Sequence, residues 1–208
     1  MPRQNRVTPF STLIATPARG QWLGNRGCLH AADGHIRRLY QTRRWIVCLL
    51  EYKGARRALM QPGRWTELFF LDEATALAAG HRPCAYCQRA RYDEFRAMWA
   101  AANPGLASSG RPGADEIDAV LHGERLNPQR ERLTYPARLD RVPDGAFVAR
   151  AGRASLVLAG ALRPWTPVGY GAPSVLPPET EVAVLTPRSV VNTLAAGFTL
   201  QIDPSASP

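Results

Sequence analysis

Hydrophobic and polar positions in the first half of the chain predict a pair of strands. Residues 44–52 (RWIVCLLEY) are rich in branched and aromatic side chains, and residues 56–60 follow after a short gap. The gap, Lys53-Gly54-Ala55, contains a glycine and has a length that suits a tight turn between antiparallel strands. The pattern therefore predicts a β-hairpin that turns on Gly54.

Two helices are predicted after this hairpin. In residues 72–80, Asp72 can cap the amino end of a short helix, and Gly80 suits the left-handed position that often follows the last turn. In residues 89–102, four apolar residues recur at helical spacing and predict a stripe that packs against the core. They are Tyr92, Phe95, Met98 and Trp99.

The pattern changes after the second of these helices. Residues 103–114 (NPGLASSGRPGA) are rich in Pro, Gly and Ser, which disfavour helix and strand alike, and they predict a linker. A third helix is predicted over residues 115–126, because a periodic run ends there at Asn127-Pro128. Short strands are predicted over residues 146–150, 155–158 and 182–185.

The carboxy-terminal part predicts one more helix, over residues 188–196. Thr186-Pro187 offers a cap followed by a proline in the first turn, and Gly197 can end the helix. Residues 198–202 are then expected to return as an edge strand.

These elements predict an α+β protein with two domains. The first domain, over residues 1–102, contains the hairpin and short helices, and a linker follows over residues 103–114. The second domain, over residues 115–208, has a helix and then a small β-rich, barrel-like unit with one late helix.

Composition excludes several classes of protein. With 208 residues, 45% of them hydrophobic and 21% charged, the chain resembles a folded globular protein rather than a disordered one. No run approaches the roughly 18–20 apolar residues of a membrane span, and the amino terminus lacks the apolar stretch of a signal peptide. Four cysteines are too few for a disulfide-rich secreted scaffold. We therefore expect a cytoplasmic protein without a membrane partner.

Positive charge is concentrated in the first half of the chain. Residues 1–104 contain 16 Lys and Arg against 7 Asp and Glu, whereas residues 105–208 contain 10 of each. In the segment 37–64 the basic residues alternate with aromatic ones, a combination that suits phosphate contacts and base stacking, although a solvated rim of a hairpin would look the same. The candidate nucleic-acid-binding residues are Arg37, Arg38, Arg43, Arg44, Lys53, Arg56, Arg57 and Arg64.

The cysteines predict a zinc site that would stabilise the first domain. Cys84 and Cys87 form a CxxC after Pro83, a spacing that presents two sulfurs from one tight turn. A thioredoxin-like redox pair is the alternative, but it should follow a strand, and here a predicted helix precedes it. Cys28 and Cys48 are expected to complete the Zn²⁺ ligand set. If Cys48 is instead a small core residue, His30 becomes the substitute ligand, and His81 is a further candidate beside the CxxC.

The residues around the CxxC resemble a known family. Phe69-Phe70 and the run ALAAGHRPCAYC at residues 76–87 are similar to the second half of the Ada-type metal-binding domain: a paired aromatic, an alanine-rich helix, then Gly-aromatic-Arg-Pro-Cys-x-x-Cys. The resemblance covers residues 65–88. It implies zinc bound by four cysteines, Cys84 and Cys87 among them, and contact with the DNA backbone. The family's first two cysteines lie a few residues apart, unlike Cys28 and Cys48, so the family's methyl-acceptor activity is not implied here.

These observations predict a zinc-binding protein that binds nucleic acid through the basic hairpin, with DNA favoured over RNA by the resemblance. Two alternatives stay open: a nucleic-acid-modifying or repair enzyme that uses the Cys-ligated zinc, and a zinc-folded protein-interaction module. A catalytic zinc keeps one coordination position open, so the number of protein ligands separates these classes. His122 and Glu124 on one predicted helix could supply acid and base groups, although such residues are more often exposed solubilising side chains.

Overall fold

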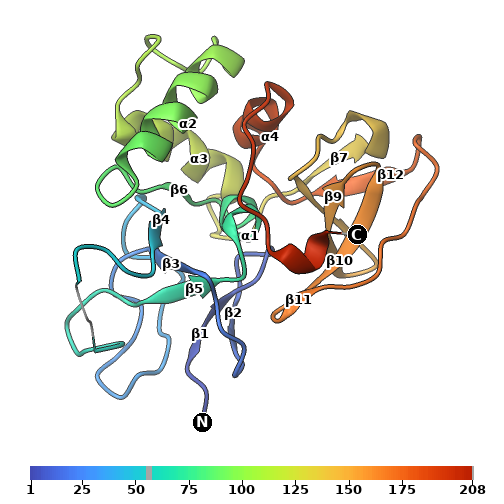
Figure 1. Cartoon of the computed structure of the whole chain (residues 1–208). Coiled ribbons are helices and arrows are strands. Elements are labelled where there is room, and N and C mark those ends of the chain that lie inside the picture. Colours follow the sequence, from blue (N-terminus) through green and yellow to red (C-terminus); the bar gives the residue numbers. More distant parts are fainter. Residues whose placement is uncertain (55–57, 208) are drawn as a thin grey trace.

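The computed structural model describes residues 1–54 and 58–207, which form two six-stranded sheets and four α-helices (Figure 1). The first sheet lies in the first half of the chain and the second sheet in the second half. The α+β class predicted from the sequence is confirmed.

The first sheet has the strand order β2-β1-β5-β3-β4-β6. Strand β4 lies between β3, which is antiparallel to it, and β6, which is parallel to it. Side chains alternate between the two faces of this sheet, so that Val47 points into the core while Cys48 points to the opposite face with its cross-strand neighbour Leu23. The strands are β1 (Gln4–Val7), β2 (Leu13–Ala15), β3 (Trp22–Asn25), β4 (Ile46–Leu49), β5 (Leu68–Phe70) and β6 (Arg82–Pro83).

The second sheet has the order β11-β10-β9-β8-β12-β7, and all its pairings are antiparallel. No pairing among the described residues joins its two outer strands, so it is an open sheet rather than the barrel-like unit expected from the sequence. Its strands are β7 (Tyr135–Arg138), β8 (Phe147–Arg150), β9 (Arg153–Leu158), β10 (Ala161–Thr166), β11 (Gly169–Tyr170) and β12 (Glu181–Val184).

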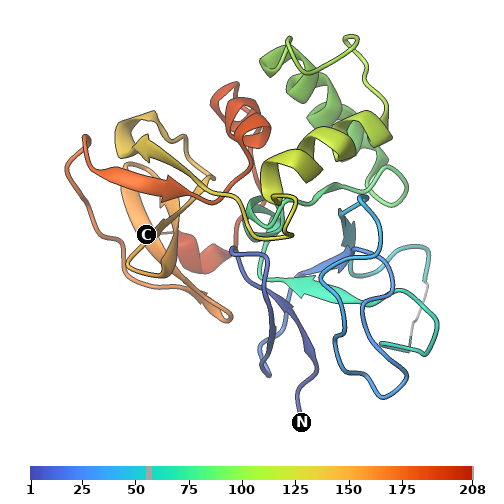
Figure 2. The same cartoon turned by 180° about the vertical axis from the view of Figure 1, so that it is seen from behind.

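A short alanine-rich helix, α1 (Glu73–Ala78), lies between the two sheets in both views (Figures 1 and 2). Ala76 packs with the apolar face of the first sheet, whereas Ala74 and Ala78 pack with Phe147 and the second sheet. Small side chains on the faces that meet the two sheets allow both sheets to approach this helix closely. As predicted, Asp72 caps its amino end through a hydrogen bond from the Thr75 amide.

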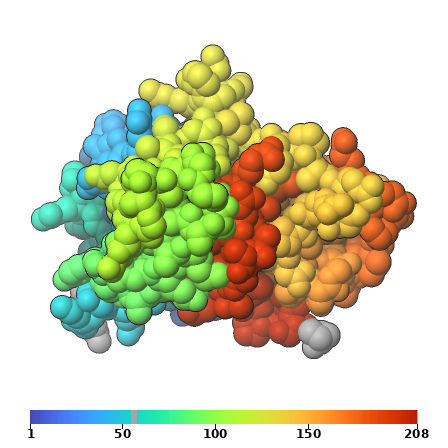
Figure 3. Space-filling model, turned by 90° about the horizontal axis from the view of Figure 1, so that it is seen from above, coloured from blue at the N-terminus to red at the C-terminus, as the bar shows by residue number. Residues whose placement is uncertain are grey.

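The remaining helices cover the top of the molecule in Figure 1: α2 (Arg89–Ala102), α3 (Ala114–Arg125) and α4 (Arg188–Ala195). Seen from above, the red helix α4 lies between the green α2 and the orange strands of the second sheet (Figure 3). All three helices agree with the predicted ones to within one residue at each end. The predicted stripe of α2 is buried, except that Met98 is half-buried.

The largest hydrophobic cluster contains residues from both sides of the predicted linker. Phe95 and Trp99 of α2, Ile117 of α3 and Val148 of β8 belong to one buried group. Residues 103–113 connect two helices that share this core. The division into domains at 103–114 stays a prediction, but the two halves are packed against each other through α1, α2 and α3.

Two predicted strands are wrong. Residues 58–60 do not pair with β4 in the predicted hairpin, because both edges of β4 are already paired, with β3 and β6. A turn is present at Lys53 and Gly54, and residues 58–60 are not in a strand, while residues 55–57 lie outside the described part. Residues 198–202 do not form an edge strand either. Phe198 packs against Phe95, and the Gln201 carbonyl accepts a hydrogen bond from the Glu73 amide at the start of α1.

The start of α4 is capped differently from the prediction. The Thr186 hydroxyl accepts a hydrogen bond from the Phe147 amide and does not cap the helix. Instead the carboxyl group of Glu124, at the end of α3, accepts hydrogen bonds from the Ser189 amide and hydroxyl. Within the described residues, no helix is long and apolar enough to cross a membrane.

Candidate metal centre

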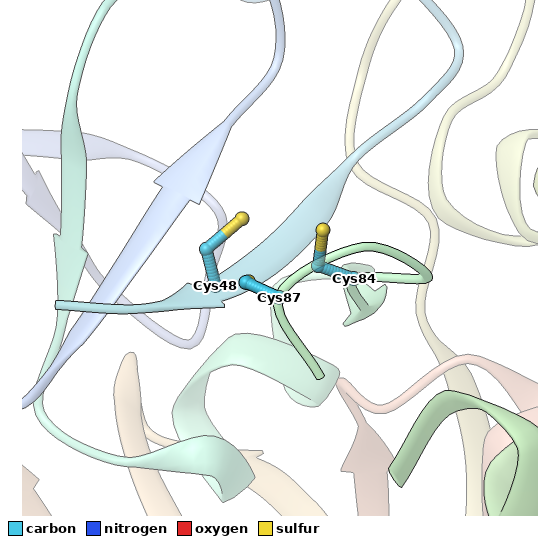
Figure 4. A group of neighbouring side chains, drawn as sticks. All are labelled: Cys48, Cys84 and Cys87. Carbon is cyan, nitrogen blue, oxygen red and sulfur yellow. The ribbon is translucent and has the colours of Figure 1, made fainter. Parts of the chain in front are cut away.

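Three cysteine sulfurs converge at one edge of the first sheet. The Sγ atoms of Cys48, Cys84 and Cys87 all lie within 4.8 Å of one another. Cys48 comes from β4, and the other two come from the loop between β6 and α2, which faces it (Figure 4). The structure therefore brings together three of the four cysteines predicted as ligands.

Backbone pairing accounts for this convergence. Pro83 lies opposite Val47 in the parallel pair of β6 and β4, and the Cys84 amide donates to the Val47 carbonyl at 2.9 Å. The Gln88 side chain donates to the same carbonyl at 2.7 Å. Both ends of the Cys84–Cys87 turn are thus attached to the residue that precedes Cys48.

The turn itself has the hydrogen bonding of a metal-binding knuckle. The Tyr86 amide donates to the Cys84 sulfur at 3.4 Å, and such a bond stabilises a thiolate rather than a thiol. Helix α2 begins two residues after Cys87, so its positive end also lies near the sulfurs.

The three thiols influence one another strongly. Hydrogen bonds from Cys48 and Cys87 lower the pKa of Cys84 well below its ordinary value. Hydrogen bonds to Cys84 and Cys87, together with burial, raise the pKa of Cys48. A hydrogen bond from Cys48 acts to lower the pKa of Cys87, but the Cys84 sulfur and burial outweigh it and the net shift is upward. The Cys84 thiol therefore loses its proton readily, whereas the thiols of Cys48 and Cys87 keep theirs, because three thiolates at this spacing would repel one another.

A divalent cation would remove that repulsion. Metal ligation requires deprotonated sulfur, and a cation among three sulfurs supplies the positive charge that lets all of them ionise. Sulfur donors suit zinc and other soft metals better than magnesium or calcium. This group can therefore hold a metal ion, and it provides three ligands of the four that tetrahedral coordination needs.

A cavity of about 350 Å³ opens beside the three cysteines. Its floor is the outer face of β3, β4 and β5, and residues 49–52 and 59–67 form a further wall. Four aromatic side chains line it: Tyr52, Trp65, Phe69 and Tyr86. The other lining residues besides the three cysteines are Leu23, Asn25, Ile46, Leu49, Leu50, Leu59 and Glu67.

Cys28 and His30 lie outside the group of three. Cys28 borders a different hollow, with Gln41, Arg44 and Trp65. The imidazole of His30 is buried and bonded, its Nδ1 at 2.6 Å from the Thr66 hydroxyl and its Nε2 at 3.2 Å from the Gln61 carbonyl oxygen. Neither residue contributes to the sulfur cluster, so the four-cysteine set, with His30 as substitute, stays a prediction.

His81 also points elsewhere. Its Nε2 accepts a hydrogen bond from Arg26 Nε at 3.1 Å, and its ring packs edge-on against Phe70. Burial, with further contributions from Arg26 and Arg125, lowers its pKa well below the ordinary value. It is thus a neutral core histidine and not part of the metal group.

The predicted basic residues are mainly at the surface. Arg37, Arg43, Arg44, Lys53 and Arg64 are exposed, and Arg38 is half-buried. Arg56 and Arg57 lie outside the described residues. Among the described side chains, an ion pair involves one of these cations only in Arg44 with Asp115, at 2.9 Å.

Other arginines of the chain are interior, which the charge pattern did not reveal. Arg26 and Arg125 are fully buried, with their guanidinium carbons 3.9 and 4.0 Å from the ring centre of Trp45. Arg125 donates to the Gly80 carbonyl at 2.7 Å, and Arg132 donates to the Ala78 carbonyl. Arg125 and Arg132 thus satisfy carbonyl groups at the end of α1 and just after it, and Arg26 donates to the Ser11 carbonyl at 3.0 Å.

The acid and base groups considered on the third helix are engaged in the fold. Glu124 caps α4, as described above, and the His122 ring packs edge-on against Tyr40. The cavity residues Glu67, Asn25 and Trp65 are the ones that the sequence did not identify. They are far apart in sequence, and no local motif connects them with the CxxC.

Comparisons of the chain with protein-family models, with curated proteins and with solved structures found no match.

Proposed function

We propose that this protein binds zinc through Cys48, Cys84 and Cys87 and binds nucleic acid beside that metal. The observation that carries the proposal is the convergence of three sulfurs within 4.8 Å, because a CxxC turn facing a third cysteine supplies the thiolate donors of a zinc site. Zinc is preferred because it is the usual metal of a CxxC knuckle. The resemblance of residues 65–88 to the Ada-type domain supports the same metal.

Nucleic-acid binding is supported by exposed positive charge in the connections of the first sheet. Exposed Arg37, Arg43, Lys53 and Arg64 come from the segments that connect the strands of the first sheet, and no carboxylate pairs with them among the described residues. Such cations can neutralise phosphates without reading sequence. The Ada-type resemblance favours the DNA backbone over RNA.

The metal part of the proposal is tested by metal analysis of purified variants. Cys48→Ser, Cys84→Ser and Cys87→Ser should each lose most of the bound zinc, and Cys28→Ser should keep it. The Cys28 variant is the matched control, because it removes a thiol of the same chain outside the cluster. A wild-type protein purified without metal would contradict the proposal.

The nucleic-acid part is tested by salt dependence. Each phosphate contact contributes roughly 0.7–0.9 to the slope of log affinity against log salt. Changing Arg37, Arg43, Lys53 and Arg64 to Gln should therefore lower the magnitude of that slope by up to about 2.8–3.6. The control changes Arg111, Arg141, Arg150 and Arg153 to Gln, which alters charge equally at exposed positions of the second half. Equal effects of the two variants would contradict a site on the first sheet.

An enzyme acting on nucleic acid is a second candidate, favoured by one observation. The described residues supply three ligands, and a catalytic zinc keeps its fourth position open to water or substrate. Mass spectrometry of the oligonucleotide and the protein after incubation would distinguish an enzyme that modifies the strand from a methyl acceptor. A changed oligonucleotide mass indicates an enzyme acting on the strand, and a methyl group on a cysteine indicates a single-turnover acceptor.

A further inference from the structure

The cavity beside the three cysteines has the size and lining of a site for one planar ring. It has a volume of about 350 Å³ and contains four aromatic side chains. Two of them, Tyr52 and Tyr86, meet edge-on with ring centres 5.2 Å apart. Tyr86 is 70% exposed, so much of its ring is in contact with solvent and free to stack on a ligand.

The polar groups of the cavity favour a neutral ligand with hydrogen-bonding edges. The Asn25 side-chain oxygen accepts from the Gly27 amide at 2.6 Å, which leaves its NH₂ group to donate. Glu67 is buried, and one of its carboxyl oxygens accepts from the Met60 amide at 2.6 Å. The three sulfurs and this carboxyl group make the interior unfavourable for an anion, so a phosphate group would not enter.

The ammonium group of Lys53 lies beside the cavity, where it could contact a phosphate that stays outside the cavity. Lys53 is exposed, and its Nζ is 5.4 Å from the ring centre of Tyr52 and 5.8 Å from that of Tyr86. The ammonium group therefore sits beside two aromatic rings of the cavity wall. An aromatic wall, an interior that excludes phosphate and a cation outside it together match the parts of a nucleotide.

We propose that this cavity receives one unpaired nucleobase of a single strand, stacked on its aromatic wall beside the metal, while Lys53 contacts the adjoining phosphate. This inference rests on the proposed nucleic-acid binding and specifies the form of the partner. Stacking on aromatic side chains tolerates any base, so the site would select single strands over duplexes without strong sequence preference.

The test compares two labelled strands with the metal-loaded full chain. One is a short oligothymidylate, and the other has the same number of phosphates but abasic sugars. The abasic strand should bind about 5- to 150-fold more weakly, the range that corresponds to the stacking of one base. Equal affinities with the usual salt dependence would overturn the inference and leave nucleic-acid binding intact. Failure of both strands to bind would overturn the proposed function as well.

Substitutions in and outside the cavity test whether the base binds there. Tyr86→Ala should abolish the difference between the two strands, and Tyr40→Ala should keep it, because Tyr40 packs on Trp45 and His122 and does not line the cavity. Leu50→Trp, at a 46% exposed lining position, should fill the cavity and give the same loss as Tyr86→Ala. The metal content of each variant is measured as a control, and it should equal that of the wild type if the cysteine turn is intact. A difference between strands that persists in both cavity variants would overturn this placement of the base.

Discussion

Arg82 and Asp118 form a buried, doubly hydrogen-bonded ion pair between strand β6, which leads into the CxxC turn, and helix α3. The Nε–Oδ1 and Nη2–Oδ2 distances are 3.0 and 2.7 Å, and the two side chains are 4% and 2% exposed. Arg82 lies two residues before Cys84. The pair therefore holds the CxxC turn against a helix that belongs to the second half of the chain.

Removing one partner of this pair should be strongly destabilising. Asp118→Asn leaves the Arg82 guanidinium buried without its counter-charge, which typically lowers the free energy of unfolding by about 3–5 kcal/mol. Asp115→Asn on the same helix is the control, because Asp115 and its partner Arg44 are 73% and 66% exposed and solvent screens their interaction, so the loss of stability should be small. Urea unfolding of both variants measures the difference, and similar losses would contradict this role for Arg82–Asp118.

The fourth coordination position should accept a small external ligand. With three protein sulfurs, Co²⁺ substituted for zinc would keep one position for solvent. Added imidazole should then shift the visible absorption bands of the cobalt protein. The Cys28→Ser variant should give the same spectrum and the same shift. A spectrum indifferent to imidazole, or one altered by Cys28→Ser, would indicate a fourth ligand from the protein.

His81 should make the protein less stable in mild acid. Burial lowers its pKa in the folded state, so the folded chain stays neutral at this residue while the unfolded chain takes up a proton below about pH 6.5. The unfolded state then binds more protons, and the free energy of unfolding falls as pH falls below that value, by up to about 1.4 kcal/mol per pH unit.

The non-titrating variant His81→Gln isolates this contribution. Its glutamine can still accept from Arg26, and acid release of the metal affects both proteins alike. Urea unfolding at neutral and mildly acidic pH should show a shallower loss of stability in His81→Gln than in the wild type. Identical pH slopes would mean that His81 titrates normally in the folded protein.

Gly80 should tolerate a side chain less well than Gly197. Both have positive φ, +83° and +100°, so alanine at either position is strained by about 1–2 kcal/mol. A Cβ at Gly80 would also lie 2.6 Å from Cδ of the buried Arg125, whereas none of the described atoms lies within 4 Å of one at Gly197. Thermal or urea unfolding should therefore show a larger loss for Gly80→Ala, and equal losses would show that Arg125 can move aside.

The predicted helices were recognisable from sequence because their signals are local. Asp72 and Gly80 mark the ends of α1, and the spacing of Phe95 and Trp99 marks the buried side of α2. Capping and helical periodicity depend on neighbours within a few residues, so they survive any arrangement of the rest of the chain.

The hairpin prediction depended on strand pairing, which local signals do not determine. Residues 44–52 do contain a strand, but which strands pair with it is decided by segments far away, and β3 and β6 occupy both of its edges. The same holds for the positive charge, since Arg26 and Arg82 contribute to the charge excess of the first half of the chain but are buried. Burial depends on long-range packing that composition does not contain.

By itself the sequence determined the α+β class, the four helices and the CxxC as the start of a candidate metal site. Only the tertiary structure decided that Cys48 joins Cys84 and Cys87 while Cys28 does not, and that Glu67 and Trp65 share a cavity with them. The physical reason is distance along the chain. A CxxC turn is held by its own backbone, whereas the third sulfur and the cavity wall come together only when β4 pairs with β6 and with β3.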